Sequence, residues 1–128
     1  MSNFKFQVIN PVLHSELRLK IMVALDSLGS ADFMYLCQIT DSTRGNLSTQ
    51  ITTLKDAGYI EVSKSGVLGR FSRTSCSITA LGRKALHAYE EGLRQLFTQQ
   101  IPPLQEEETS KTGSISNKKD KVPQIKNK

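Results

Sequence analysis

Apolar residues recur at helical spacing in four segments of the chain, which are separated by glycines, prolines and short polar turns. The segments predict helices over residues 11–28, 33–39, 43–57 and 79–100. Gly29 and Gly58 follow the first and third segments, where a left-handed residue commonly ends a helix. The inward face expected for the first helix comprises Leu13, Leu17, Ile21, Ala24, Leu25 and Leu28. That of the second comprises Phe33, Leu36, Cys37 and Ile39.

Two segments between the third and fourth helices have the pattern of short strands. Residues 59–62 alternate apolar and polar side chains, and residues 74–78 follow a loop that contains two glycines, so the two segments predict a long β-hairpin. Residues 30–32 fit either a short strand or a helix cap. The chain is expected to be mainly α-helical with a small β-hairpin. The turn at 40–42 joins two helices as a helix-turn-helix.

The helix over 43–57 buries one apolar stripe and leaves a face of short polar side chains outside. A face that serves only solubility more often carries Glu and Lys, which form helices better than Ser and Thr. Asn and Gln make paired bonds to adenine, Ser and Thr bond bases or phosphates, and the helix start favours phosphate. The candidate DNA contacts of this helix are Arg44, Asn46, Ser48, Thr49, Gln50 and Thr53. The alternative is an ordinary solvated helix.

Positive charge gathers in the predicted hairpin. Lys64, Arg70 and Arg73 fall within ten residues, and no acid follows Glu61 before the second strand ends. The hairpin would bring these charges near a DNA backbone, a contact that positions a protein without reading sequence. Thr74 completes the candidate DNA contacts of the hairpin. The alternative is a hairpin tip that only increases solubility.

The whole chain is basic and has the length of one domain. Its 128 residues carry a net charge of +5, which favours a polyanionic partner such as DNA, RNA or an acidic membrane. No apolar run approaches the roughly 20 residues that span a bilayer, and the first residues lack the apolar core of a signal peptide. We therefore expect a cytoplasmic protein without a membrane partner. Arg18 and Lys20 are interpreted as solvated charges on the first helix.

The composition changes after Pro102 and Pro103, which end the last helix. Residues 105–128 contain almost no apolar side chains, so we expect this end to be disordered. The predicted organisation is a DNA-binding domain over 1–101, with a dimerisation helix at about 79–100, and a disordered basic tail over 102–128. The tail either adds salt-sensitive DNA affinity or is a solvating end without function.

The last predicted helix carries more apolar residues than one buried face needs. The spacing of three, four and three residues is typical of a seam between two helices, and it is formed by Leu86, Tyr89, Leu93 and Leu96. We expect this seam to form a homodimer, because helix-turn-helix proteins often place two reading helices one DNA turn apart. The alternative is that the whole set packs on its own domain. A small-molecule effector could bind between the first and last helices of the dimer.

Residues that would indicate catalysis or metal binding are scarce. His14 and His87 fall on different helices, and the sequence contains no phosphate-binding loop, nucleophile elbow, dinucleotide fingerprint or zinc-ligand spacing. We therefore expect neither an enzyme nor a cofactor. Cys37 and Cys76 do not form a disulfide scaffold, and the pattern leaves open whether either of them is redox active.

Several short runs resemble the small winged-helix transcriptional regulators of prokaryotes, in the single-domain group related to the MarR and ArsR families. The runs fall within residues 12–97, and the more specific ones are Gly-Asn-Leu-Ser from Gly45 and Ala-Gly-Tyr-Ile from Ala57. The resemblance implies a dimeric winged-helix fold, a recognition helix at about 43–57, a wing at about 64–74, and repression or activation at a promoter.

Carried over residue by residue, the resemblance gives outward positions of the recognition helix to Asn46, Ser48 and Thr49, and wing positions to Arg70, Arg73 and Thr74. Gln50 stands where such regulators often have His, which affects sequence preference more than binding. The wing also has fewer prolines and lysines than the family pattern. The competing hypothesis is a winged helix that binds another protein and no longer uses DNA.

Overall fold

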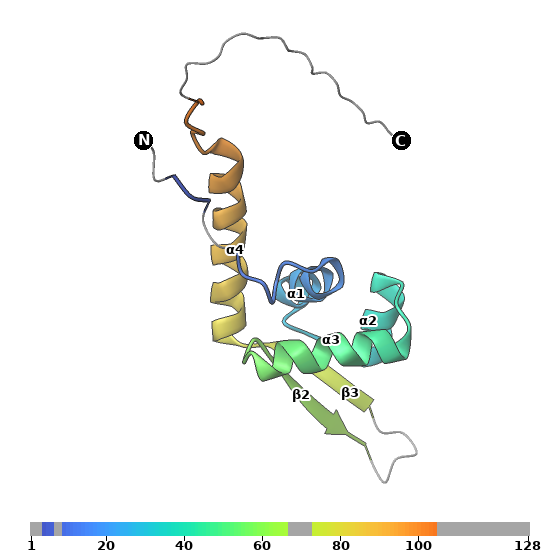
Figure 1. The fold of residues 1–128 in the computed structure, drawn as a ribbon. Helices are drawn as coiled ribbons and strands as arrows, with labels where there is room; N and C mark the ends of the chain where they lie inside the picture. Colours follow the sequence, from blue (N-terminus) through green and yellow to red (C-terminus); the bar gives the residue numbers. More distant parts are fainter. Residues whose placement is uncertain (1–3, 7–8, 67–72, 105–128) are drawn as a thin grey trace. The chain divides into compact units, whose positions relative to one another are not determined.

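Four helices and a three-stranded antiparallel sheet are present in the described part of the chain, which comprises residues 4–6, 9–66 and 73–104 of a computed structural model. The arrangement confirms the predicted winged-helix fold class (Figure 1). In chain order the elements are α1 (Glu16–Leu28), β1 (Ser30–Asp32), α2 (Phe33–Thr40), α3 (Arg44–Asp56), β2 (Ile60–Ser65), β3 (Arg73–Ile78) and α4 (Ala80–Thr98).

Strand β3 lies at the centre of the sheet and pairs antiparallel with both β1 and β2. Cys76 stands opposite Ala31 on one side and Val62 on the other. The segment 30–32, which the sequence left undecided, forms both predicted structures. It pairs as β1, and Asp32 also caps α2, because its carboxylate accepts the backbone N–H of Met34 at 2.9 Å.

The end of α2 and the start of α3 are each defined by a side-chain hydrogen bond, with a left-handed residue between them. The Thr40 hydroxyl donates to the Leu36 carbonyl at 2.6 Å, which satisfies a buried polar group, and Asp41 has a φ of 54°. Thr43 then begins α3 by accepting the N–H of Asn46 at 3.1 Å. These residues therefore end α2 and begin α3, which leaves a short turn between the two helices of the helix-turn-helix.

The predicted start of the first helix was wrong. Ser15 is the N-cap of α1, and residues 11–13 form a separate turn. The reason is the Asn10 side chain, whose oxygen accepts the N–H of Val12 at 2.9 Å and of Leu13 at 3.2 Å and so holds a turn apart from the helix. The other helix predictions differ from the structure by two residues or fewer at each end.

The core is built around α1, which contacts α2, α3, α4 and the strands β1 and β3. Because neighbours surround α1, its buried surface is wider than the predicted stripe and includes Met22, which is fully buried. Two residues predicted to point inward are exposed instead: Leu28, at the last position of α1, and Ile39, near the end of α2. Both lie at helix ends, where fewer elements are close enough to cover them.

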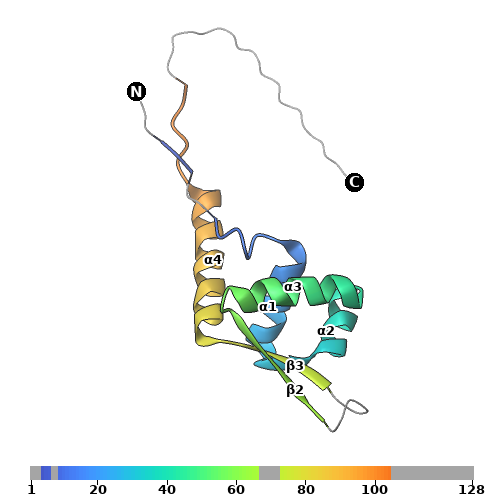
Figure 2. The same ribbon diagram turned by 60° about the horizontal axis from the view of Figure 1, so that its bottom comes forward.

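The β2–β3 hairpin extends beyond α3, on the side away from α4 (Figures 1 and 2). The unit that holds these elements runs over Phe6–Gln99, and the described residues 4–5 and 100–104 belong to a second unit. Of the expected tail, 102–128, residues 105–128 lie outside the described residues. Among the helices that the structure does describe, none is both long and apolar enough for a membrane span.

Candidate nucleic-acid interface

Helix α3 buries one stripe and exposes the opposite face, as predicted. Leu47, Ile51 and Leu54 are buried in the core. The exposed residues of the predicted set are Arg44, Asn46, Ser48 and Thr49, whereas Thr53 is half-buried. The helix therefore presents short polar side chains on the surface that a DNA groove would meet.

The threonine hydroxyls of this face are already bonded to the helix backbone. Thr49 donates to the Gly45 carbonyl at 3.1 Å, and Thr53 donates to the Thr49 carbonyl at 3.2 Å. Such back-bonding is a common alternative for Thr within helices. Each hydroxyl oxygen is therefore free to accept a further hydrogen bond, whereas donation to a ligand would require its bond to the helix to break.

The Gln50 side chain is half-buried and bonds to two other residues of the protein. Its Oε1 accepts a hydrogen bond from Nη1 of Arg18 at 2.5 Å, and its Nε2 donates to Oδ1 of Asn46 at 3.2 Å. The interpretation of Arg18 as a solvated charge was wrong. Arg18 is half-buried, and its Nε also donates to the Val12 carbonyl at 2.6 Å. Sequence patterns did not reveal this contact because it joins residues 32 positions apart.

The hairpin brings predicted phosphate contacts close to α3. Lys64 pairs with Thr74 across the strands, and Ser65 pairs with Arg73. A surface hollow of about 510 Å³ is lined by Ser48 of α3 together with Lys64 and Thr74 of the hairpin. The predicted contact Arg70 lies outside the described residues.

Lys55 also lines this hollow, and sequence analysis missed it. It is exposed in the last turn of α3, where a cation suits the negative end of the helix dipole. The signal was available in the sequence, because Lys55 follows Ser48 by seven residues, about two helical turns, and so falls on the same face of the helix.

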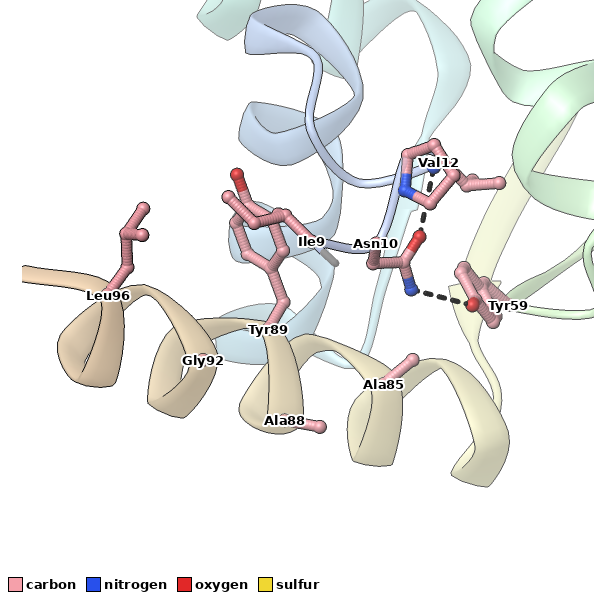
Figure 3. A pocket seen from close by; sticks show the side chains of 10 residues that line it. Ile9, Asn10, Val12, Tyr59, Ala85, Ala88, Tyr89, Gly92 and Leu96 are labelled. Atoms are coloured by element: carbon pink, nitrogen blue, oxygen red, sulfur yellow. Dashed lines mark hydrogen bonds between the residues drawn. The ribbon is translucent and has the colours of Figure 1, made fainter. Parts of the chain in front are cut away.

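A second cavity, of about 560 Å³, lies between α4 and the segment that precedes α1 (Figure 3). Most of its lining is apolar, and a hydrogen bond of 3.0 Å from Nδ2 of Asn10 to the Tyr59 hydroxyl borders it (Figure 3). Tyr89 of α4 lines it too, and its hydroxyl lies 2.8 Å from Nδ1 of His14. This cavity lies close to the place predicted for an effector.

The predicted seam of α4 is partly occupied by the core of its own chain. Leu86 and Tyr89 are only 6% and 7% exposed, and Leu93 packs against the core as well. Leu96 is half-buried, whereas Phe97 beside it is 83% exposed. The large apolar side chains that α4 still exposes are therefore Leu81 in its first turn and Phe97 in its last turn.

The cysteines and histidines occupy structural positions. Burial raises the pKa of the Cys76 thiol to about 11, with a smaller contribution from the negative charge of Asp32. The thiol stays protonated at neutral pH, which opposes redox reactivity. Nε2 of His87 lies 3.2 Å from the Asp26 carboxylate, whereas His14 contacts the Tyr89 hydroxyl, so the two histidines have different partners. Within the described ranges, no three residues among His, Cys, Asp and Glu are grouped to hold a metal ion.

Comparison with known proteins places this geometry in a family. A model of winged helix DNA-binding domains matches residues 17–97. An uncharacterized protein of Methanocaldococcus jannaschii is 34% identical over 85 residues, which is 66% of this chain and 91% of the relative.

Solved structures agree with the family match. A transcriptional regulator homologue of Pyrococcus horikoshii has a TM-score of 0.62 and 28% identity, with 68% of this chain and 85% of that chain covered. BpsR of Bordetella bronchiseptica, whose DNA binding is regulated by 6-hydroxynicotinic acid, shares the fold with a TM-score of 0.58, 17% identity, and coverage of 70% and 67%. The resemblance to small winged-helix regulators is thus confirmed, and the chain belongs to the family of winged-helix DNA-binding domains.

Proposed function

We propose that the protein is a sequence-specific transcriptional regulator that reads double-stranded DNA with α3 and grips the phosphate backbone with its wing. The observation that carries the proposal is the hollow where α3 meets the hairpin, since Ser48, Lys64 and Thr74 line it together. A polar helix face with cations beside it is the combination that binds a groove and its flanking phosphates. Membership of the winged-helix DNA-binding family supports the same function.

Each candidate residue has a role that follows from its place. Arg44 stands in the first turn of α3, where backbone N–H groups and the helix dipole favour a phosphate. Asn46 offers its amide to a base edge. Lys64 and Arg73 are exposed on the hairpin and neutralise phosphates, as Arg70 would from the loop between the strands.

The regulator acts as a homodimer in this proposal, with the C-terminal part of α4 in the interface. The exposed Phe97 supports it together with the half-buried Leu93 and Leu96, because neighbouring apolar side chains that remain accessible form the kind of surface that a second copy covers. The mainly apolar cavity beside Tyr89 would hold a small-molecule effector. Binding there could change the position of α4 relative to α1 and so the spacing of the two reading helices. The site of action would be the cytoplasm.

Fluorescence anisotropy of the purified protein tests the function. Its own upstream DNA is compared with a scrambled duplex of the same composition over a series of salt concentrations. Tighter, salt-dependent binding of the upstream duplex is the expected result, because base contacts add to phosphate contacts only on the correct sequence. If neither duplex binds even at low salt, the protein-interaction alternative takes the place of this proposal.

A further inference from the structure

A chain of hydrogen bonds runs from α1 to the outer face of α3. Nη1 of Arg18 donates to Oε1 of Gln50 at 2.5 Å, and Nε2 of Gln50 donates to Oδ1 of Asn46 at 3.2 Å. The guanidinium is itself fixed, because its Nε donates to the Val12 carbonyl at 2.6 Å. The chain ends at an exposed side chain in the first turns of the proposed recognition helix.

The direction of this chain follows from the chemistry of its first member. A guanidinium only donates hydrogen bonds, so the atom of Gln50 that meets Arg18 is the oxygen. Gln50 then has its NH₂ group on the side of Asn46, so the atom of Asn46 that it meets is also an oxygen. Arg18 therefore determines the orientation of two amides, neither of which would have a preferred orientation on an open surface.

We infer that Gln50 is a positioning residue that presents the NH₂ group of Asn46 to DNA and so makes Asn46 select a base with acceptors. This inference rests on the proposed function. In the major groove, guanine offers two acceptors, N7 and O6, and thymine offers one, O4, whereas adenine and cytosine each offer an amino donor. Because Oδ1 of Asn46 already accepts from Gln50, its NH₂ group is the better-placed partner. Guanine is the base selected, because its two acceptors can each receive one of the two hydrogens of the NH₂ group, whereas thymine offers one acceptor. Sequence analysis had associated Asn and Gln with adenine.

Gln50→Glu tests the inference by reversing the direction of the last bond. A carboxylate still accepts from Arg18 but cannot donate, so Asn46 must turn its NH₂ group toward Glu and its oxygen toward DNA. The preference at the base pair read by Asn46 is then expected to change from guanine to a base with an amino donor. A change of about tenfold in relative affinity is expected for one base contact.

Selection of binding sites from randomised duplexes measures these preferences directly. Asn46→Ala first identifies the base pair at which discrimination depends on Asn46. Thr52→Glu is the matched control, because it adds the same charge at an exposed position of α3 outside the hydrogen-bond chain. It should weaken all sequences and leave the preference for guanine intact. Arg18→Met should weaken discrimination at the same base pair. If the Arg18→Met protein does not fold, Gln50→Glu still tests the inference.

The outcomes separate the inference from the proposed function. A wild-type protein that selects no sequence overturns both. A wild-type protein that selects a site, but has no base pair sensitive to Asn46→Ala, overturns the inference alone. The same holds if wild-type protein prefers any base other than guanine at that pair, or if Gln50→Glu keeps the guanine preference. A guanine preference that reverses in Gln50→Glu and persists in Thr52→Glu supports the inference.

Discussion

Gly82 shows how much one residue contributes to the position of α4. A Cβ atom at Gly82 would lie 2.1 Å from the carbonyl oxygen of Tyr59, a backbone atom that cannot move aside cheaply. That oxygen also accepts the N–H of Thr79, and the Thr79 hydroxyl donates to the Gly58 carbonyl at 2.7 Å. The first turn of α4 therefore packs directly on the backbone turn that follows α3.

Gly82→Ala should lower the free energy of unfolding by about 2 kcal/mol, because the new methyl group forces backbone atoms apart. Urea unfolding followed by circular dichroism measures the change. Gly92→Ala is the control in the same helix, since a Cβ there meets nothing within 4 Å. It should raise stability by up to about 1 kcal/mol through helix propensity. Equal stability of Gly82→Ala and wild-type protein would mean that α4 is not packed this closely.

Helix α4 buries some of its apolar side chains in the core of its own chain and exposes others. Its first half is held to α1, where Nη1 of Arg83 lies 2.7 Å from the Asp26 carboxylate, and Leu86 and Tyr89 are buried. Its last turns expose Phe97 beside the half-buried Leu96. The periodicity of α4 predicted an apolar face but could not divide it between the core and a second copy, because both uses need the same spacing.

Phe97→Asp should convert a dimer into a monomer, because a carboxylate would have to lose its water in an apolar interface. Analytical ultracentrifugation at micromolar concentrations measures the change. Leu81→Asp serves as the control, since Leu81 is exposed at the other end of the same helix. A wild-type monomer, or a Phe97→Asp protein that still forms dimers, would contradict a dimer interface at this end of α4.

For the whole molecule, local patterns predicted the fold and only part of the site. Leu47, Ile51 and Leu54 have the helical spacing that orients α3, so its exposed face could be predicted. The internal role of Gln50 could not be predicted, because it depends on Arg18 from a different helix. The start of α1 was missed for a different, local reason, since the Asn10 side chain bonds to the backbone of Val12 and competes with the helix. Sequence patterns predict which face of a helix is buried and which is exposed. Side-chain contacts between two different elements can be identified only from the structure.

The central claim is that α3 determines sequence preference through contacts with bases, whereas the hairpin binds phosphates and adds affinity for any sequence. Anisotropy titrations of Asn46→Ala and Arg73→Ala test it most directly, on a selected binding site and on a scrambled duplex over a salt series. Asn46→Ala should weaken the selected site by about tenfold and leave the scrambled duplex unchanged. Arg73→Ala should weaken both duplexes equally and lower the salt slope by about one. Equal weakening of both duplexes by Asn46→Ala, or an unchanged salt slope for Arg73→Ala, would contradict the claim.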